Sequence, residues 1–331
     1  MKNGDKKINF VISVFGKRYI GMLIGNTFSI SRSNPNAKIS IFYQDIDEEI
    51  IQIIAMTFPQ TEFTKTNFNF SADHISRIAS KTIMWNYAIN CLDSGCLVFL
   101  DVDMLVLKDI SPFFQDEFDV LYTTKIKENC QLNTGIMLVY NTKKAVLLFK
   151  SWMNRAIEII NNSELFRKSV SSIYGAPDQM ALIEIINFNP INKRHNINLS
   201  GQEITLKSEE CKILNETNST SISKFTHVVH YKGGWQNILI DGFNFTKKRP
   251  KNDSWEMYIY YIKNYKEALH FIFEKTGKDI INEKYIKIPF YLNDEIKENK
   301  LLYWAYYIMS ALNHFSLKLK RKVIKKLSIN N

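Results

Sequence analysis

An α/β fold with a mostly parallel central sheet flanked by helices is predicted by two features of this 331-residue chain. Short runs of β-branched and aromatic residues, such as KISIFY at 38–43, alternate with segments whose apolar residues recur at helical spacing. From about residue 252 the pattern changes to long aromatic-rich helices without further strands. We therefore expect a Rossmann-like α/β domain over residues 1–250 and a helical extension over residues 251–331.

Each element follows from its local pattern. In the first hundred residues we expect strands at Ile8–Val14, Lys38–Tyr43, Thr61–Thr66 and Cys96–Leu100, and helices at Tyr19–Ser31, Asp47–Thr57 and Ser76–Cys91. Beyond them we expect strands at Val120–Thr124, Gly135–Tyr140 and Phe225–Tyr231, and helices at Lys143–Ile160 and Pro177–Ile186. Proline at the first position of the last helix is a common helix start.

The net charge of +10 is concentrated at the C-terminus. Residues 301–331 hold six Lys/Arg and no Asp or Glu, which leaves +4 for the first 300 residues. Nucleic-acid binding needs a basic surface along the domain and is therefore disfavoured. Within 313–331 apolar residues recur every three or four positions with cations between them, which is typical of a basic helix on anionic lipid. A packed terminal helix with a solvated basic face is the alternative.

A cytoplasmic location, with possible peripheral contact with the inner face of the cytoplasmic membrane, is expected from three features. No segment reaches the roughly 20 apolar residues that cross a bilayer. The apolar start is interrupted by Lys17 and Arg18, which disfavours a signal peptide. The four cysteines form no C-x-x-C pair, which favours reduced thiols.

The stretch VFLDVDMLVLKDI at 98–110 places two aspartates in an apolar run. Asp101 and Asp103 follow the strand Cys96–Leu100, and ligands of open α/β sheets bind at the carboxyl ends of strands. Two carboxylates one residue apart can hold a divalent cation and, through it, a phosphate. A solvated strand end with a capping Asp is the alternative, but apolar residues on both sides favour the metal site.

Three further polar groups adjoin predicted elements. Asn133 to Gly135 precede a strand, Asp178 and Gln179 open a helix whose dipole favours an ionised Asp, and His230 to Gly234 end the last strand. This last group offers an imidazole for a metal, a cation for phosphate and glycines for close backbone approach. A histidine taken alone is more often structural.

Together these motifs resemble the GT-A glycosyltransferases, and most closely the family-8-like galactosyl- and glucosyltransferases of bacterial surface polysaccharides. The resemblance covers residues 8–240 and is carried by LVFLDVDMLVLKDISPFF, LNTGIMLVYNTKK, APDQMAL and HVVHYKGGW. It implies the GT-A fold and a nucleotide-sugar donor, usually a UDP-sugar, held through Mn²⁺ or Mg²⁺. It also implies an acceptor hydroxyl on a glycan or a lipid-linked sugar.

The resemblance also implies roles for individual residues. Asp101 and Asp103 match the metal-binding pair, with Val102 between them at the donor, and His230 matches the third protein ligand of the metal. Asn133 matches a residue near the donor sugar or acceptor.

The remaining matches concern the reaction centre and the donor. Asp178 and Gln179 match the polar pair at the reaction centre, and Arg77 resembles an arginine that contacts the donor. The usual H-x-x-G-x-x-K-P-W ending is here H-Y-K-G-G-W, so we expect Lys232 to contact the diphosphate. Our candidates for contact with the base are Ser13, Phe15 and Tyr19, although core packing explains both aromatic residues equally well.

The predicted activity is sugar transfer, with retention or inversion left open. If transfer retains configuration, Asp178 and Gln179 stabilise an oxocarbenium-like state; if it inverts, Asp178 acts as general base. A haloacid-dehalogenase-type phosphohydrolase is the main alternative, but Met104-Leu105 stands where that class has Thr or Val. A nucleotidylyltransferase would need a more glycine-rich loop than 15–18, and a degenerate carbohydrate-binding relative remains open.

Overall fold

The computed structural model describes residues 7–70, 74–93, 95–125, 131–140, 143–171, 173–217, 222–232 and 255–278. Within these ranges one sheet has eight strands in the order β3-β2-β1-β4-β7-β6-β9-β8. Its strands are β1 (Ile8–Phe15), β2 (Lys38–Gln44), β3 (Thr61–Lys65), β4 (Cys96–Leu100), β6 (Val120–Thr124), β7 (Leu132–Tyr140), β8 (Arg194–Leu199) and β9 (Gln202–Glu210). Only β7 and β8 run against the other strands, so the predicted mostly parallel sheet is confirmed.

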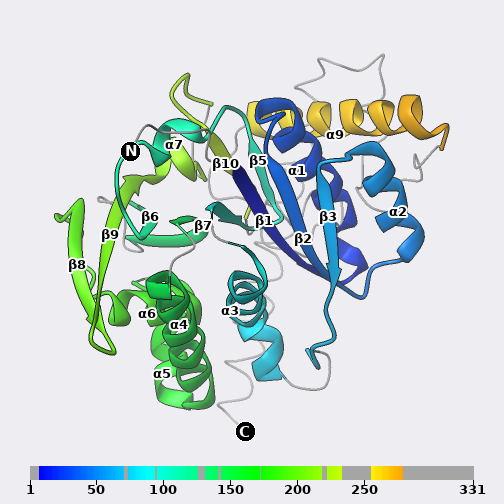
Figure 1. The fold of residues 1–331 in the computed structure, drawn as a ribbon. Helices are drawn as coiled ribbons and strands as arrows, with labels where there is room; N and C mark the ends of the chain where they lie inside the picture. The colour runs from blue at the N-terminus through cyan, green and yellow to red at the C-terminus, as the bar shows by residue number, and fades with distance from the viewer. Residues whose placement is uncertain are drawn as a thin grey trace, which may run out of the picture.

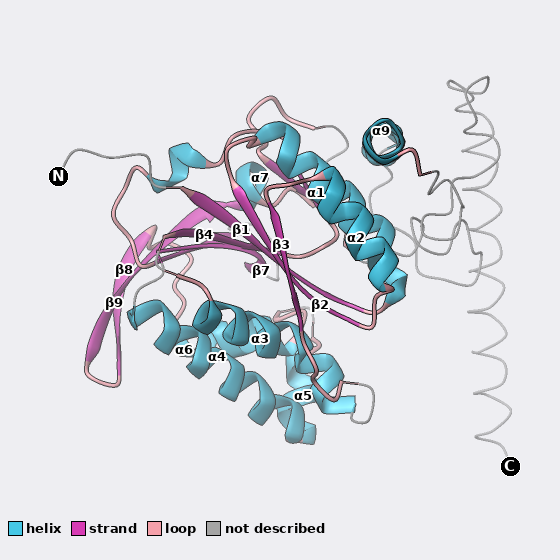
Figure 2. Ribbon diagram, turned by 45° about the vertical axis from the view of Figure 1, so that its right-hand side comes forward, coloured by secondary structure: helices cyan, strands magenta, loops and turns pink. Residues whose placement is uncertain are grey.

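Helices cover both faces of this sheet (Figures 1 and 2). The described helices are α1 (Ile20–Ser33), α2 (Glu48–Thr57), α3 (His74–Cys91), α4 (Lys143–Asn161), α5 (Ser163–Ser169), α6 (Pro177–Ile185), α7 (Cys211–Leu214) and α9 (Trp255–Thr276). One face carries α1, α2 and α9, and the other carries α3 to α6. Short 3₁₀ turns lie at Lys17–Tyr19 and Ser111–Phe114.

The apolar strands are buried on both faces because each face has its own helical layer. Along β4, Val98 and Leu100 enter the core beneath α1, α2 and α9, whereas Leu97 and Phe99 enter the core beneath α3 and α4. All four side chains are 0–1% exposed. A strand buried on both sides reads as a continuous apolar run, which is why CLVFL carries no polar alternation.

Four features differ from the sequence predictions. The β8–β9 hairpin was not expected, because its exposed strand residues leave only short apolar alternation. Helix α5 lies between the two predicted helices Lys143–Ile160 and Pro177–Ile186, where no element was predicted, and its N-cap Asn162 accepts from the amides of Glu164 and Leu165. Asn133 to Gly135 lie inside β7 and do not form a loop before it. Met104–Val106 forms a short strand, β5, that pairs with β10 (Val228–His230).

Helix α9 belongs to the same core as α1 and α2. The Asn264 side chain donates to the carbonyl oxygen of Gly25 at 3.0 Å, and the rings of Phe58 and Phe271 stack at 5.7 Å. The boundary near residue 250 falls outside the described residues, so the division into 1–250 and 251–331 stays a prediction. The basic segment 313–331 also lies outside them.

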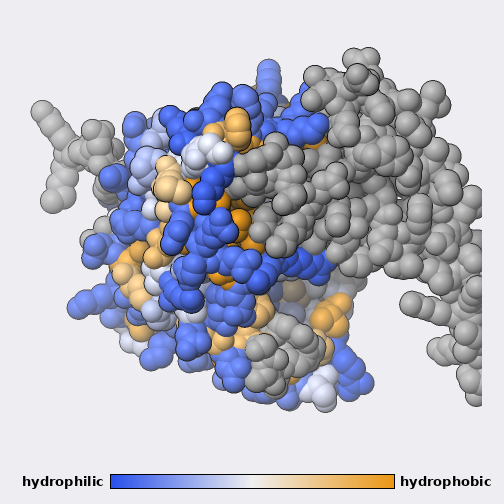
Figure 3. All heavy atoms as spheres, turned by 90° about the vertical axis from the view of Figure 1, so that its right-hand side faces the viewer, coloured by the Kyte–Doolittle hydropathy of each residue, from blue (hydrophilic) through white to orange (hydrophobic). Residues whose placement is uncertain are grey.

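Hydrophilic side chains predominate on the described part of the face in Figure 3, with hydrophobic ones between them. Among the described residues, no helix combines the length and the apolar character that crossing a bilayer requires. The hydrophobic side chains of the described chain are mainly committed to the two core layers.

Candidate active site

The two aspartates lie in a turn that leaves the central sheet directly after β4. The Asp101 amide donates to the carbonyl oxygen of Gly135 on β7 at 2.8 Å. Asn26 of helix α1 is fully buried, and its amide donates to the carbonyl oxygens of Asp101 at 3.3 Å and Met104 at 2.9 Å. The turn is therefore fixed by hydrogen bonds from the neighbouring strand and from α1.

The pairing of β5 with β10 brings His230 to this turn. In the antiparallel register His230 lies opposite Met104, and the Tyr231 amide donates to the Asp103 carbonyl oxygen at 2.8 Å. Gly135 makes room for the histidine ring, because a Cβ built there would lie 2.7 Å from His230 Nδ1. Two three-residue strands and one glycine thus position a side chain from the far end of the domain.

Asp101, Asp103 and His230 form a group that can hold a divalent metal ion. One ligand atom from each lies within 4.8 Å of the others, and within the described residues this is the only such group of three or more. His230 Nε2 lies 3.2 Å from an Asp103 oxygen and 3.7 Å from an Asp101 oxygen. Asp103 and His230 are buried. Two carboxylates and an imidazole are donors that divalent metals accept, so the predicted ligand set fits a cation.

Burial and neighbouring charges shift the pKa values of the two carboxyls in opposite directions. Burial raises the pKa of Asp101, and the like charge of Asp103 adds to this, although Lys81 and His230 act against it. For Asp103, burial also acts to raise the pKa, but the charge and hydrogen bond of a protonated His230, together with a backbone hydrogen bond and the charge of Lys81, outweigh it, and the pKa is lowered. Two carboxyls held this close, with unequal pKa values, are typical of functional sites.

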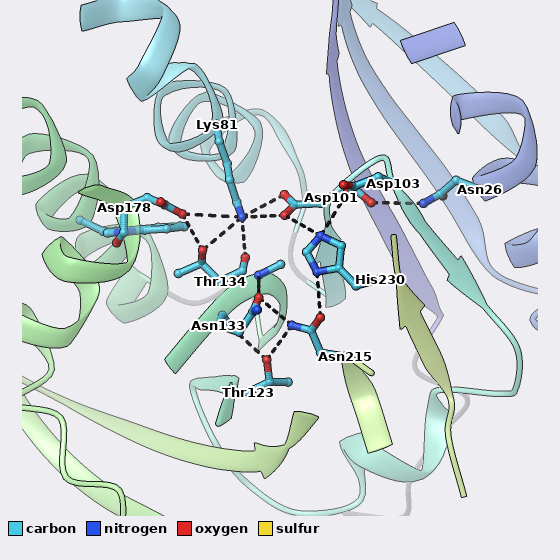
Figure 4. Close-up of polar contacts among 12 residues, drawn as sticks. Asn26, Lys81, Asp101, Asp103, Thr123, Asn133, Thr134, Asp178, Asn215 and His230 are labelled. Atoms are coloured by element: carbon cyan, nitrogen blue, oxygen red, sulfur yellow. Dashed lines mark hydrogen bonds and ion pairs between the residues drawn. The ribbon is translucent and has the colours of Figure 1, made fainter. Parts of the chain in front are cut away.

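Lys81 of helix α3 lies between the carboxylates of Asp101 and Asp178 (Figure 4). Its Nζ lies 2.9 and 3.1 Å from the two Asp101 oxygens and 3.8 Å from an Asp178 oxygen. It also donates to the Thr134 carbonyl oxygen at 2.7 Å and lies 4.6 Å from the centre of the Trp85 ring. Sequence reasoning missed this lysine. The available signal was its position four residues before buried Trp85, on the apolar stripe of the helix.

Asp178 is held at the first turn of α6, where the helix dipole stabilises a carboxylate. The Thr134 hydroxyl donates to its Oδ2 at 2.5 Å, and the Trp152 indole donates to its backbone carbonyl at 2.7 Å. The predicted position of Asp178 at a helix N-terminus is thus confirmed.

Two adjoining cavities share Lys81, Asp101 and Asp103. The first has a volume of about 520 Å³ and the second about 300 Å³. Predicted site residues that line the first are Ser13, Phe15, Tyr19, Asp101, Val102 and Asp103; those that line the second are Asp101, Asp103, Asn133, Asp178, Gln179, His230 and Lys232. The structure therefore brings together every predicted site residue except Arg77.

Arg77 lies on helix α3, but its side chain is outside the described part of the chain. Lys232 is exposed at the edge of the second cavity, and the glycines that follow it are outside the described residues. Lys81, one helical turn after Arg77, is the cation of α3 that the structure places at the site.

Neither protein-family models nor curated proteins match the chain. Among solved structures, glycosyltransferase GlyE of Streptococcus pneumoniae TIGR4 matches at 14% identity with a TM-score of 0.51, over 82% of this chain and 64% of that one. Its apo form matches at 14% identity with a TM-score of 0.52, over 83% and 65%. The galactosyltransferase LgtC, in complex with donor and acceptor sugar analogues, superposes at a TM-score of 0.46 with 13% identity, over 81% and 96%.

The similarity to GlyE establishes the fold. The chain has the glycosyltransferase fold predicted from its motifs, and it spans about two thirds of the length of GlyE, 64% to 65%. The Asp-x-Asp pair with His230 is present within that fold.

Proposed function

We propose that the protein is a metal-dependent glycosyltransferase that moves a hexose from a UDP-sugar to an acceptor hydroxyl. The observation that carries this proposal is the pair of cavities that meet at Lys81, Asp101 and Asp103. A nucleotide-sugar has a matching form, because a nucleoside and a sugar are joined by a diphosphate that binds a divalent cation. The shared fold with GlyE supports the same conclusion.

The larger cavity is the proposed nucleoside site. Phe15 and Tyr19 offer aromatic rings at its wall. Ser13 also lines it, and its hydroxyl oxygen is buried without a hydrogen-bond partner among the described residues. A buried polar atom without a partner is costly, and a base could supply the missing hydrogen bond.

The junction of the cavities is the proposed diphosphate site. Mn²⁺ or Mg²⁺ bound by Asp101, Asp103 and His230 would neutralise charge on the departing diphosphate. Lys81 and Lys232 both line the second cavity, and each can donate hydrogen bonds to phosphate oxygens. Val102 lies between the metal-binding aspartates at the wall of the first cavity.

The smaller cavity is the proposed sugar and acceptor site. Asp178 and Gln179 line it, beside Asn133. We propose transfer with retention, in which Asp178 and Gln179 stabilise positive charge at the anomeric carbon while the acceptor hydroxyl attacks the same face. Inversion would instead use Asp178 as general base for the acceptor.

We further propose a surface glycan or lipid-linked acceptor, with residues 313–331 in contact with anionic lipid at the cytoplasmic membrane. The test compares the full chain with a chain that lacks 313–331, using sedimentation with anionic liposomes. Equal binding by both chains would refute the membrane contact while leaving the transferase proposal intact.

The test of the activity is UDP release from a panel of UDP-hexoses in the presence of Mn²⁺, with GDP- and CMP-sugars as comparisons. We expect release from at least one UDP-sugar, loss of release on chelation, and an α-linked product by NMR from an α-linked donor. Phosphate release from phosphate esters without UDP release would favour the phosphohydrolase. Binding of sugars without turnover would favour a non-catalytic relative.

A further inference from the structure

A buried polar network lies on the side of His230 that faces away from the carboxylates (Figure 4). Asn215 follows helix α7 and is fully buried. Its Oδ1 lies 2.9 Å from His230 Nδ1, and its Nδ2 lies 2.9 Å from both Thr123 Oγ1 and Asn133 Oδ1. Neither Asn215 nor Thr123 was predicted as a site residue.

Backbone groups settle the direction of the hydrogen bonds in this network. The Gly135 amide can only donate, and it lies 2.8 Å from Asn133 Oδ1, which must therefore be the acceptor oxygen. The Asn133 carbonyl can only accept, and it lies 3.0 Å from Thr123 Oγ1, which therefore spends its hydrogen there. Both groups that face Asn215 are consequently acceptors.

The amide of Asn215 then has one possible orientation. Its NH₂ group must face Thr123 and Asn133, so its carbonyl oxygen faces His230. The proton of the His230 ring must consequently be on Nδ1, which donates to that oxygen. In a neutral ring this leaves the lone pair on Nε2, the atom 3.2 Å from Asp103.

A local irregularity of the sheet puts the network in place. The pairing of β6 with β7 shifts between Tyr122 and Thr123, so that residues 134–136 of β7 have no partner on β6. Such bulges redirect side chains next to functional sites. Here the shift brings Thr123 opposite Asn133, where both contact Asn215.

We propose that Asn215 is a positioning residue that fixes His230 in the Nδ1–H tautomer and so presents Nε2 to the metal ion. The metal part of this proposal rests on the proposed function, whereas the tautomer does not. A metal-binding histidine whose other nitrogen lacks its partner commonly loses about 10- to 100-fold in metal affinity.

The experiment compares the full chain with Asn215→Leu, Asn215→Asp and a matched control. Asn215→Leu removes both hydrogen-bonding groups at similar volume, and Asn215→Asp keeps an acceptor for His230. The control is Asn264→Leu, which removes another buried amide, 2% exposed, that donates to Gly25 and does not touch His230.

The first measurement is the tautomer of His230 in metal-free protein, from long-range ¹H–¹⁵N spectra at alkaline pH, assigned with His230→Gln. We expect Nδ1–H in wild type, Asn215→Asp and Asn264→Leu, and a mixture or Nε2–H in Asn215→Leu. Nε2–H in wild type, or an unchanged tautomer in Asn215→Leu, would overturn the proposal.

The second measurement is Mn²⁺ affinity from the EPR signal of the free ion. We expect the Kd to rise about 10- to 100-fold in Asn215→Leu, less in Asn215→Asp, and not in Asn264→Leu. Equal affinity in Asn215→Leu and wild type would overturn the role of Asn215 in metal binding. Absence of Mn²⁺ binding by wild type would count against the proposed function, while the tautomer would still decide the role of Asn215.

Discussion

Gly135 lies on β7 against the ring of His230, and we expect Gly135→Ala to weaken metal binding. A Cβ on Gly135 would lie 2.5 Å from Met104 Cε and 2.7 Å from His230 Cε1 and Nδ1. Comfortable contact needs about 3.5 Å, so the ring would have to move by roughly 0.8 Å, which is 3.5 − 2.7. The Met104 methyl is the end of a flexible chain and can turn away. The ring cannot, because Asn215 holds one edge and Asp103 faces the other.

The size of the effect follows from this displacement. A misplacement of about 1 Å in a reacting group can cost about 100-fold in rate, so a tenfold or greater rise in the Kd for Mn²⁺ is a moderate expectation. Overpacking a buried site also costs about 1–3 kcal/mol of folding free energy. Gly135→Ala should therefore lower both metal affinity and the unfolding temperature.

The assay is Mn²⁺ titration by EPR together with thermal unfolding in the absence of metal. The matched control is Gly95→Ala, where the nearest atom to the new Cβ is the Lys7 carbonyl oxygen at 3.8 Å, an ordinary contact. A Gly135→Ala protein with the same Mn²⁺ affinity and unfolding temperature as wild type would refute the packing argument.

Three further predictions test other parts of the molecule. Asp103→Ala should abolish Mn²⁺-dependent UDP release, and residual metal-dependent turnover would contradict the assigned ligand set. Lys81→Met removes the cation beside Asp101, so the affinity for Mn²⁺ should rise. The affinity for the donor should fall about tenfold, or about 1.4 kcal/mol, because one charge-assisted hydrogen bond is lost. Calorimetry that shows both affinities falling would contradict this prediction. Burial, with a hydrogen bond to Glu48, raises the pKa of Tyr43 to about 12. The contribution of this phenol to the free energy of unfolding is complete below the unfolded pKa of about 10 and is lost as the pH rises to about 12. Urea unfolding should therefore show a smaller loss of stability between pH 10 and about 12 in Tyr43→Phe than in the wild type.

The fold was predictable because its signals are local. The apolar run of Cys96–Leu100 needs only its own residues to mark a strand buried on both faces, and the turn after it follows from the two aspartates. The place of Asp178 at a helix start follows from Pro177 and the apolar residues after it, whereas its place at the reaction centre was implied by the family resemblance alone. These inferences use the spacing of apolar residues and the residue types at the ends of helices and strands. Both can be read within a window of about ten residues.

The pairing of β5 with β10 was not predictable in the same way. The strand Phe225–Tyr231 was predicted and contains β10, but β5 has three residues, too few for a periodic pattern. Hydrogen bonds from α1 hold β5, and backbone hydrogen bonds to the α7 region hold β10, so their register depends on distant parts of the chain. Asn215 shows the same limit, because its partners Thr123 and Asn133 come together only through the irregular pairing of β6 with β7. Its sequence context, Asn-Glu-Thr, more readily indicates a surface site than a buried amide.

The formal charges of the site explain why a lysine and a divalent cation would lie beside its three aspartates. In the form that binds a metal, the carboxylates of Asp101, Asp103 and Asp178 are ionised and the His230 ring is neutral, so with the positive charge of Lys81 the balance is −3 + 1 = −2. A divalent cation cancels this balance, and in a partly buried site the gain is larger than in water. Lys81 contacts both Asp101 and Asp178, so it offsets part of the repulsion between these two carboxylates when no metal ion is bound. The same lysine lines both cavities. With a divalent cation bound, the site would no longer be negatively charged and would not repel the negative charge of a diphosphate.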